Sequence, residues 1–106
     1  MVIYDDFAKL ELKIATVLSV EPVEGSEKLL KIQVDLGSEQ RQILSGIAKW
    51  YAPDQLVGKQ VVIIANLEPR SMMGLESNGM ILVANDPDGP VLLLPEKLVD
   101  AGATIK

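Results

Sequence analysis

Apolar and polar residues alternate in two stretches of this chain, Leu12 to Glu21 and Leu30 to Leu36. Because successive side chains of a β-strand point to opposite faces, a period of two is typical of a strand with one face in the core. The turn-forming pair Gly37-Ser38 follows the second stretch directly. Both stretches are therefore predicted to be β-strands, and the first of them is long.

Four more stretches have the composition of strands. Arg41 to Gly46 is expected to form a third strand, although its adjacent apolar pair fits either face. Val61 to Ala65 and Met80 to Ala84 are unbroken aliphatic runs, which are typical of strands buried on both sides or at a barrel seam. Val91 to Leu94, after a turn rich in Pro, Asp and Gly, is expected to be a shorter strand. The fourteen residues from Asn66 to Gly79 are expected to form a loop.

The segment from Ile47 to Val57 has apolar residues at helix-like spacing instead. Pro53 interrupts this pattern and Gly58 follows it, which predicts two short helical turns that end at the glycine. Trp50 and Tyr51 are expected to pack in the core or against this helical segment.

A short helical turn is also expected near the start of the chain. Asp5 or Asp6 precedes a group of apolar residues and would cap the turn. Phe7 and Leu10 would then lie on its buried side.

The order of these elements predicts an all-β fold in a single domain spanning residues 1–106. Three strands, a short helix, two strands and a strand-like extension are the layout of the five-stranded oligonucleotide/oligosaccharide-binding barrel, or OB-fold, in which a helix joins strands three and four. Residues 1–89 would form the barrel and residues 90–106 the extension. A generic small barrel or sandwich fits the same pattern and stays open.

Composition and charge limit what such a domain does. The 106 residues include 10 Lys and Arg against 15 Asp and Glu, and no Cys or His. Without those two residue types, Ser/His/Asp and Cys/His catalysis, disulfides and zinc-finger ligand sets are excluded. The net charge of −5 argues against an indiscriminate binder of polyanions. With no apolar run near the ~20 residues of a membrane span, a cytoplasmic protein without membrane contact is expected.

The chain has no complete sequence motif for phosphate binding, calcium binding or catalysis. A phosphate loop ending at Gly58-Lys59 would need Ser or Thr next, where the chain has Gln60. A calcium loop around Asp86 to Gly89 would place Ala84 and Pro95 at ligand positions. We therefore expect a binding protein that is not an enzyme and has no cofactor and no metal.

The OB-fold prediction indicates where a ligand would bind. Ligands of that barrel contact the outer face of strands two and three and the loops joining strands one to two and four to five. Here those loops are residues 23–28 and 66–79. Strands two and three contain no aromatic residue on which bases could stack, so a structured RNA is favoured over an extended single strand.

Five strings in these regions and beside them are distinctive: Asp6 to Ile14, Val23 to Leu29, Ser45-Gly46-Ile47, Ala65 to Arg70 and Ser77 to Met80. Together they resemble one family. The family is the tRNA-binding domain found at the C-terminus of many methionyl-tRNA synthetases, as free-standing tRNA-binding proteins and in synthetase-associated cofactors, and the resemblance extends from Asp6 to Lys106.

The resemblance implies a homodimer, with the C-terminal extension at its interface, that binds tRNA by shape with little sequence preference. It would assist methionyl-tRNA synthetase in cis or in trans, with the catalytic region of that enzyme as a further partner. Lys28, Lys31 and Arg70 are expected to meet phosphates, while Asn66 and Ser77 would hydrogen-bond the RNA backbone. The expected RNA-binding residues are Lys28, Lys31, Asn66, Arg70, Ser77, Met80, Arg41 and Lys13.

Two further expectations concern roles other than RNA contact. Met72, Met73 and Met80 are more often packing residues than ligand contacts. The acidic balance favours a second function somewhat, namely a protein-interaction or dimerisation module, including the peptide-binding chaperone role of some members of the family.

Overall fold

The computed structural model describes residues 1–106, and its strands follow the predicted order. The all-β expectation is confirmed, with a helix between the third and fourth strands. The elements are α1 (Tyr4–Ala8), β1 (Leu12–Pro22), β2 (Leu30–Asp35), β3 (Gln40–Ser45), α2 (Pro53–Leu56), β4 (Gln60–Ile64), β5 (Arg70–Met72), β6 (Leu75–Ser77), β7 (Met80–Ile81), β8 (Val83–Asp86) and β9 (Gly89–Leu92).

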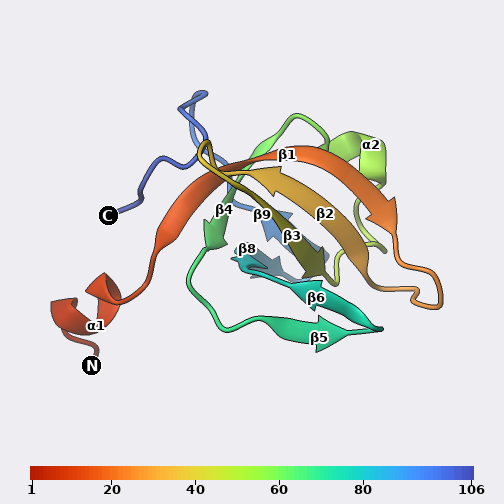
Figure 1. The fold of residues 1–106 in the computed structure, drawn as a ribbon, viewed down its shortest axis with the longest axis horizontal. Helices are drawn as coiled ribbons and strands as arrows, with labels where there is room; N and C mark the ends of the chain where they lie inside the picture. The colour runs from red at the N-terminus through yellow and green to blue at the C-terminus, as the bar shows by residue number, and fades with distance from the viewer.

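Five strands form one antiparallel sheet in the order β3-β2-β1-β4-β7. β7 packs back against β3, so the sheet curls into a nearly closed barrel (Figure 1). This arrangement, with α2 between β3 and β4, is that of the predicted OB-fold. The hairpins β5–β6 and β8–β9 are separate two-stranded sheets.

β1 is long because it pairs with different strands along its length. Its first half, Leu12 to Thr16, pairs with β4, and its second half pairs with β2. A register shift between Val17 and Ser19 bends the strand at the change of partner. The C-terminal segment 102–105 lies on the other side of the first half, where the Ile105 N–H donates to the Leu12 carbonyl at 2.9 Å.

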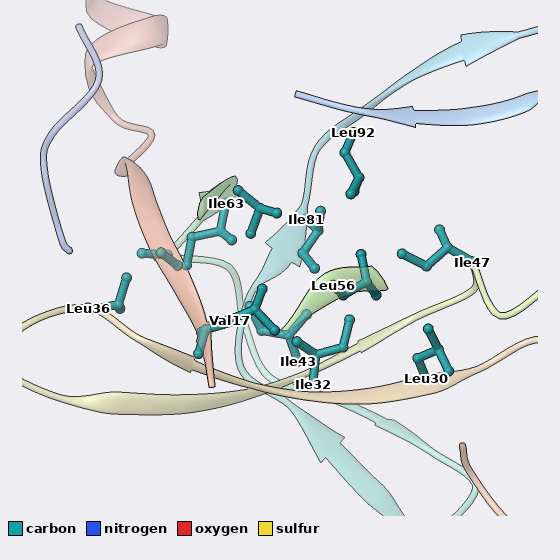
Figure 2. Packing of buried hydrophobic residues seen from close by; sticks show 14 residues of the cluster. Val17, Leu30, Ile32, Leu36, Ile43, Ile47, Leu56, Ile63, Ile81 and Leu92 are labelled. Carbon is teal, nitrogen blue, oxygen red and sulfur yellow. The ribbon is translucent and has the colours of Figure 1, made fainter. Parts of the chain in front are cut away.

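The core lies inside the barrel and is aliphatic. Figure 2 shows Val17, Ile32 and Ile43 meeting around Leu56, which α2 contributes. These four side chains are at most 2% exposed. Burial of each such Leu or Ile side chain contributes roughly 1.5–3 kcal/mol, so the alternating strands supply most of the driving force for closing the barrel.

The two aromatic residues before α2 differ in their surroundings. Tyr51 packs against the core, and its hydroxyl donates to the Pro90 carbonyl at 3.1 Å and accepts from the Leu92 N–H at 3.3 Å. The expectation of packing is confirmed for Tyr51. Trp50 is 49% exposed and lies outside the core, with its indole directly over Gly89.

The prediction for the start of the chain is wrong in two respects. Ile3, not Asp5 or Asp6, is the N-cap of α1, and no side chain caps the helix. Phe7 and Leu10 are exposed, because α1 projects beyond the barrel and has no layer against which to bury them (Figure 1).

Two expected boundaries also differ. The predicted loop 66–79 contains the hairpin β5–β6, whose turn is made by Met73 and Gly74, both with positive φ. The predicted strand 80–84 is divided: β7 completes the barrel, and the chain then leaves it to form the β8–β9 hairpin. The last strand ends at Leu92, so Leu93 and Leu94 lie outside it.

Candidate nucleic-acid interface

The loop between β1 and β2 meets the tip of the β5–β6 hairpin. Gly25, with φ +82°, lies in the loop, and a Cβ at this position would come within 3.2 Å of the Met73 Cε. A larger residue at Gly25 would therefore be opposed by both backbone conformation and space. The two loops that OB-folds use for ligands thus form one surface at this end of the barrel.

Lys28 lies in a loop whose backbone is held from both sides. The Ser26 Oγ accepts hydrogen bonds from the Lys28 N–H at 3.2 Å and the Leu29 N–H at 3.1 Å. The Lys28 carbonyl accepts from the Ala48 N–H at 2.9 Å. The Lys28 side chain is exposed and makes no salt bridge, so the fixed loop presents a free cation.

Arg70 and Met80 line one small hollow of about 60 Å³, whose floor includes Leu44 of β3. Arg70 is exposed and unpaired, and Met80 is 42% exposed. Lys31 of β2 is directly opposite Leu44 in the sheet and has its ammonium 3.6 Å from Glu21. The structure thus brings Lys31, Arg70 and Met80 to neighbouring positions around Leu44.

Two of the three methionines that were expected to be packing residues do not pack in the core. Met73 and Met80 are 54% and 42% exposed, so neither belongs to the core. Met72 is half-buried in the small hollow beside Arg70. These apolar side chains therefore lie among the exposed cations of the surface.

Ser77 and the turn after it are engaged within the protein. Ser77 is 4% exposed, and its Oγ accepts from the Leu44 N–H and donates to the Gly79 carbonyl. The Asn78 N–H donates to the Gln42 carbonyl at 2.8 Å. The hydroxyl and this backbone N–H therefore join the hairpin to β3.

The Asn66 side chain is bound to the segment that follows α1. Its Nδ2 donates to the Lys9 carbonyl at 2.7 Å, and its Oδ1 accepts from the Glu11 N–H at 2.8 Å. Both functional atoms of the amide are therefore used to attach the N-terminal arm, residues 1–11, to the end of β4.

Lys13 lies away from the joined loops, whereas Arg41 lies beside the base of the second loop. Arg41 is opposite Val34 on the inward face of β3, and its guanidinium binds Glu39 and the carbonyls of Ala65 and Asn78 at the end of the barrel. Lys13 lies in β1 between Ile63 of β4 and Thr104 of the C-terminal segment.

A larger groove opens beside Arg41, with a volume of about 740 Å³. We call it the amide groove. It is lined by residues 39–42, residues 65–69 and Asn78. Its polar residues, Gln40, Gln42 and Asn78, were missed by sequence reasoning. The alternation in β3 was available as a signal, since it places Gln40 and Gln42 on the face opposite to Ile43.

No group of three or more acidic, His or Cys side chains is placed to hold a metal ion. Neither helix has the length and apolar character needed to cross a membrane.

Comparison with known proteins identifies the family. Residues 12–104 match the family model described as "Putative tRNA binding domain". The chain belongs to this family of tRNA-binding domains. The match includes the whole barrel, both hairpins and most of the C-terminal segment.

Sequence relatives of this tRNA-binding domain include methionine–tRNA ligases. The ligase of Methanoculleus marisnigri is 53% identical over 102 residues, which cover 96% of this chain and 15% of the ligase. The ligase of Caldanaerobacter subterraneus is 45% identical over 101 residues, covering 95% of this chain and 16% of the ligase. The chain thus spans about 15% of the length of the relatives it matches.

Solved structures share the fold over the full length of the tRNA-binding domain. A protein from Pyrococcus horikoshii described as MetRS-related has a TM-score of 0.94 at 34% identity, covering 100% of this chain and 98% of its own. A protein from Bacillus anthracis described as the chaperone CsaA has a TM-score of 0.92 at 29% identity, covering 100% and 99%.

Proposed function

We propose that this domain binds tRNA as a structured RNA, on the surface made by the β1–β2 loop and the β5–β6 hairpin. The contact between Met73 and Gly25 carries the proposal, because it places the loop of Lys28 beside the hairpin of Arg70. Two unpaired cations on loops held in place are suited to phosphate contacts, which position an RNA without reading its sequence. The family match supports tRNA as the ligand.

We expect the surface to recognise the shape of the RNA, with little dependence on base sequence, because it has no stacking residues in β2 and β3 and few cations. β2 and β3 contain no aromatic residue for stacking single-stranded bases. The cations are few and the net charge is −5, so affinity would depend on a good fit to a folded RNA backbone and its 2′-hydroxyls. Lys31 and Met80, next to Arg70, would extend the same surface.

Titration of labelled unfractionated tRNA at increasing salt tests the RNA proposal. Each phosphate contact makes the logarithm of affinity fall more steeply with the logarithm of salt concentration. Lys28→Ala and Arg70→Ala should each weaken binding. Each should also reduce the slope of log affinity against log salt concentration by the equivalent of about one phosphate contact. Lys97→Ala, a matched change of an exposed lysine in the C-terminal extension, should leave both unchanged. Absence of binding by the wild-type chain at low salt would refute the proposal.

The domain would act as a homodimer, joined through its N-terminal arm and C-terminal extension. Both segments expose large apolar side chains: Ile3 and Tyr4 are 63% and 75% exposed, and Leu94 and Leu98 are 51% and 82% exposed. Both also adjoin β1, since residues 1–11 lead into it and residues 102–105 pair with it. Exposed apolar groups gathered in this way mark interaction surfaces.

Light scattering tests the dimer. A particle of twice the 11.5 kDa chain mass is expected at micromolar concentration. Leu98→Glu should shift it towards the monomer, because the substitution would bury a carboxylate at the interface. Val91→Glu changes a residue that is 48% exposed in β9 and should leave the mass unchanged. A wild-type chain with the mass of a monomer would rule out the dimer.

Within a synthetase, or beside one in the cytoplasm, such a domain would raise the affinity of methionyl-tRNA synthetase for its tRNA. A second site on the same RNA acts through effective concentration, so weak binding by the domain is sufficient. Peptide binding is a second candidate function, favoured by the similarity to the B. anthracis CsaA structure. Competition between tRNA and an unfolded polypeptide for the same surface would distinguish a shared site from a separate one.

A further inference from the structure

The amide groove adjoins the proposed tRNA surface, since Leu67 and Glu68 line both the groove and the small hollow beside Arg70. It lies between the start of β3 and the connection that leaves β4, which swings outward from the barrel (Figure 1). Its volume of about 740 Å³ is within the ~300–1,000 Å³ typical of ligand sites. Its hydrogen-bonding groups, its shape and its charge indicate which kind of ligand it would bind.

Several hydrogen-bonding groups of the groove have no partner within the protein. The side-chain amides of Asn78 and Gln40 make no hydrogen bond, and the N–H groups of Leu67 and Glu68 donate to no acceptor in the chain. Gln42 differs, because its amide is bound to Gln33 and to the Glu76 carbonyl. The groove therefore offers both donors and acceptors in amide form.

Arg41 forms a flat, fixed wall. Glu39 and the Ala65 carbonyl hold its Nε and Nη1, while Nη2 makes no hydrogen bond within the protein. Leu67, which is 38% exposed, and Pro69 add apolar lining. Guanidinium planes and apolar side chains are surfaces on which unpaired bases stack.

The charge of the groove disfavours a phosphate. Arg41 is paired with Glu39, and Glu68 has no cationic partner, so the lining carries one net negative charge. A phosphate would meet this carboxylate, whereas the neutral edge of a base would not. Amide side chains are well matched to base edges, since each presents a donor and an acceptor.

We propose that the amide groove receives one unpaired nucleobase of the bound RNA. The Asn78 side chain and the unpaired N–H groups of Leu67 and Glu68 hydrogen-bond its edge. The Arg41 guanidinium lies against its face. The inference rests on the proposed tRNA binding and adds to it a base contact that phosphate recognition does not supply. It also gives Arg41, expected from the sequence only to be an RNA-binding residue, a defined role through the plane of its guanidinium.

Titration of tRNA at several salt concentrations separates a base contact from a phosphate contact. Asn78→Ala should weaken binding about tenfold at every salt concentration and leave the salt dependence unchanged, because no charge is removed. Asn85→Ala, an exposed asparagine in β8, is the matched control and should bind as the wild type does. Equal affinity of Asn78→Ala and wild type, or a flattened salt dependence, would overturn the inference.

A second measurement does not depend on tRNA. In NMR spectra of the ¹⁵N-labelled chain, adenosine 5′-monophosphate should shift the side-chain resonance of Asn78 and the backbone N–H resonance of Leu67. Ribose 5-phosphate, which lacks the base, should not shift them, and Asn78→Ala should abolish the response of Leu67. Equal shifts with both compounds would overturn the base site while leaving tRNA binding intact. Base-specific shifts without tRNA binding would instead refute the proposed function.

Discussion

The backbone N–H of Leu44, in the edge strand β3, donates to the side chain of Ser77 and not to another backbone group. The distance is 2.9 Å, and the same hydroxyl donates to the Gly79 carbonyl at 3.1 Å. One buried hydroxyl thus continues the hydrogen-bonding edge of β3 where no strand pairs with it. The seam is therefore held by a side chain together with the backbone hydrogen bond from Asn78 to Gln42.

Ser77→Ala is expected to destabilise the fold by about 1–3 kcal/mol, because it leaves the buried Leu44 N–H without an acceptor. Urea denaturation followed by circular dichroism would measure the change. Ser71→Ala, in the exposed part of β5, removes a hydroxyl that makes no hydrogen bond and should change stability little. Equal stability of the two variants would contradict the role assigned to Ser77.

Gln60 attaches the C-terminal extension to the barrel. It is 7% exposed, its Nε2 donates to the Val99 carbonyl at 2.6 Å, and its Oε1 accepts from the Val99 N–H at 3.0 Å. Gln60→Leu should release residues near Val99, with faster hydrogen exchange at the Val99 amide and a stability loss of about 1–3 kcal/mol. Unchanged exchange at Val99 would show that other contacts hold the extension.

Asn66 permits a test in which one hydrogen bond is kept. Asn66→Asp retains the acceptor for the Glu11 N–H but loses the donor to the Lys9 carbonyl, whereas Asn66→Ala loses both. Protection of the Glu11 amide from exchange should therefore be highest in wild type, intermediate in Asn66→Asp and lost in Asn66→Ala. The barrel strands should keep their protection in all three, because the hydrogen bonds of the Asn66 side chain are made only to the N-terminal arm. Full protection of Glu11 in Asn66→Ala would be inconsistent with this attachment.

Two glycines, Gly102 and Gly46, form a matched pair for testing how the local backbone conformation limits substitution by alanine. Gly102 has φ +89°, and a Cβ there would collide with the Leu36 carbonyl, so Gly102→Ala should cost about 1–3 kcal/mol or more. At Gly46 the φ is not positive and no atom lies within 4 Å of an added Cβ, so Gly46→Ala should alter stability by less than about 1 kcal/mol. Thermal denaturation would rank the two, and the reverse order would contradict the tight fit of the C-terminal segment.

The strands of the barrel could be predicted because their pattern is local. The predicted strand 12–21 differs from β1 by one residue at its end, and those at 41–46 and 61–65 are shifted by one residue from β3 and β4. A period of two is visible whenever one face of a strand is buried. The hairpin β5–β6 could not be found in the same way, since its three-residue strands are too short for alternation and no strand residue except Ser77 is buried.

The roles of the candidate residues depend on contacts far apart in sequence. Asn66 binds the segment at Lys9 and Glu11, which lies 55 residues or more away, and Ser77 binds Leu44 across 33 residues. Neither residue type reveals which backbone groups will lie beside it. Lys28 and Arg70, by contrast, are unpaired cations in the two segments predicted as loops, although Arg70 lies in β5 of a hairpin that the sequence did not predict.

Pairing of β1 with residues 102–105 has a consequence for the order of folding. The hydrogen bond between Ile105 and Leu12 joins positions more than 90 residues apart. During synthesis the first long strand is made early, but its outer edge stays open until the last residues of the domain are available. Contacts of such sequence separation close slowly, and an unpaired strand edge is a site of aggregation in the meantime. The outer edge of β1 is therefore covered only after residues 102–105 have been made.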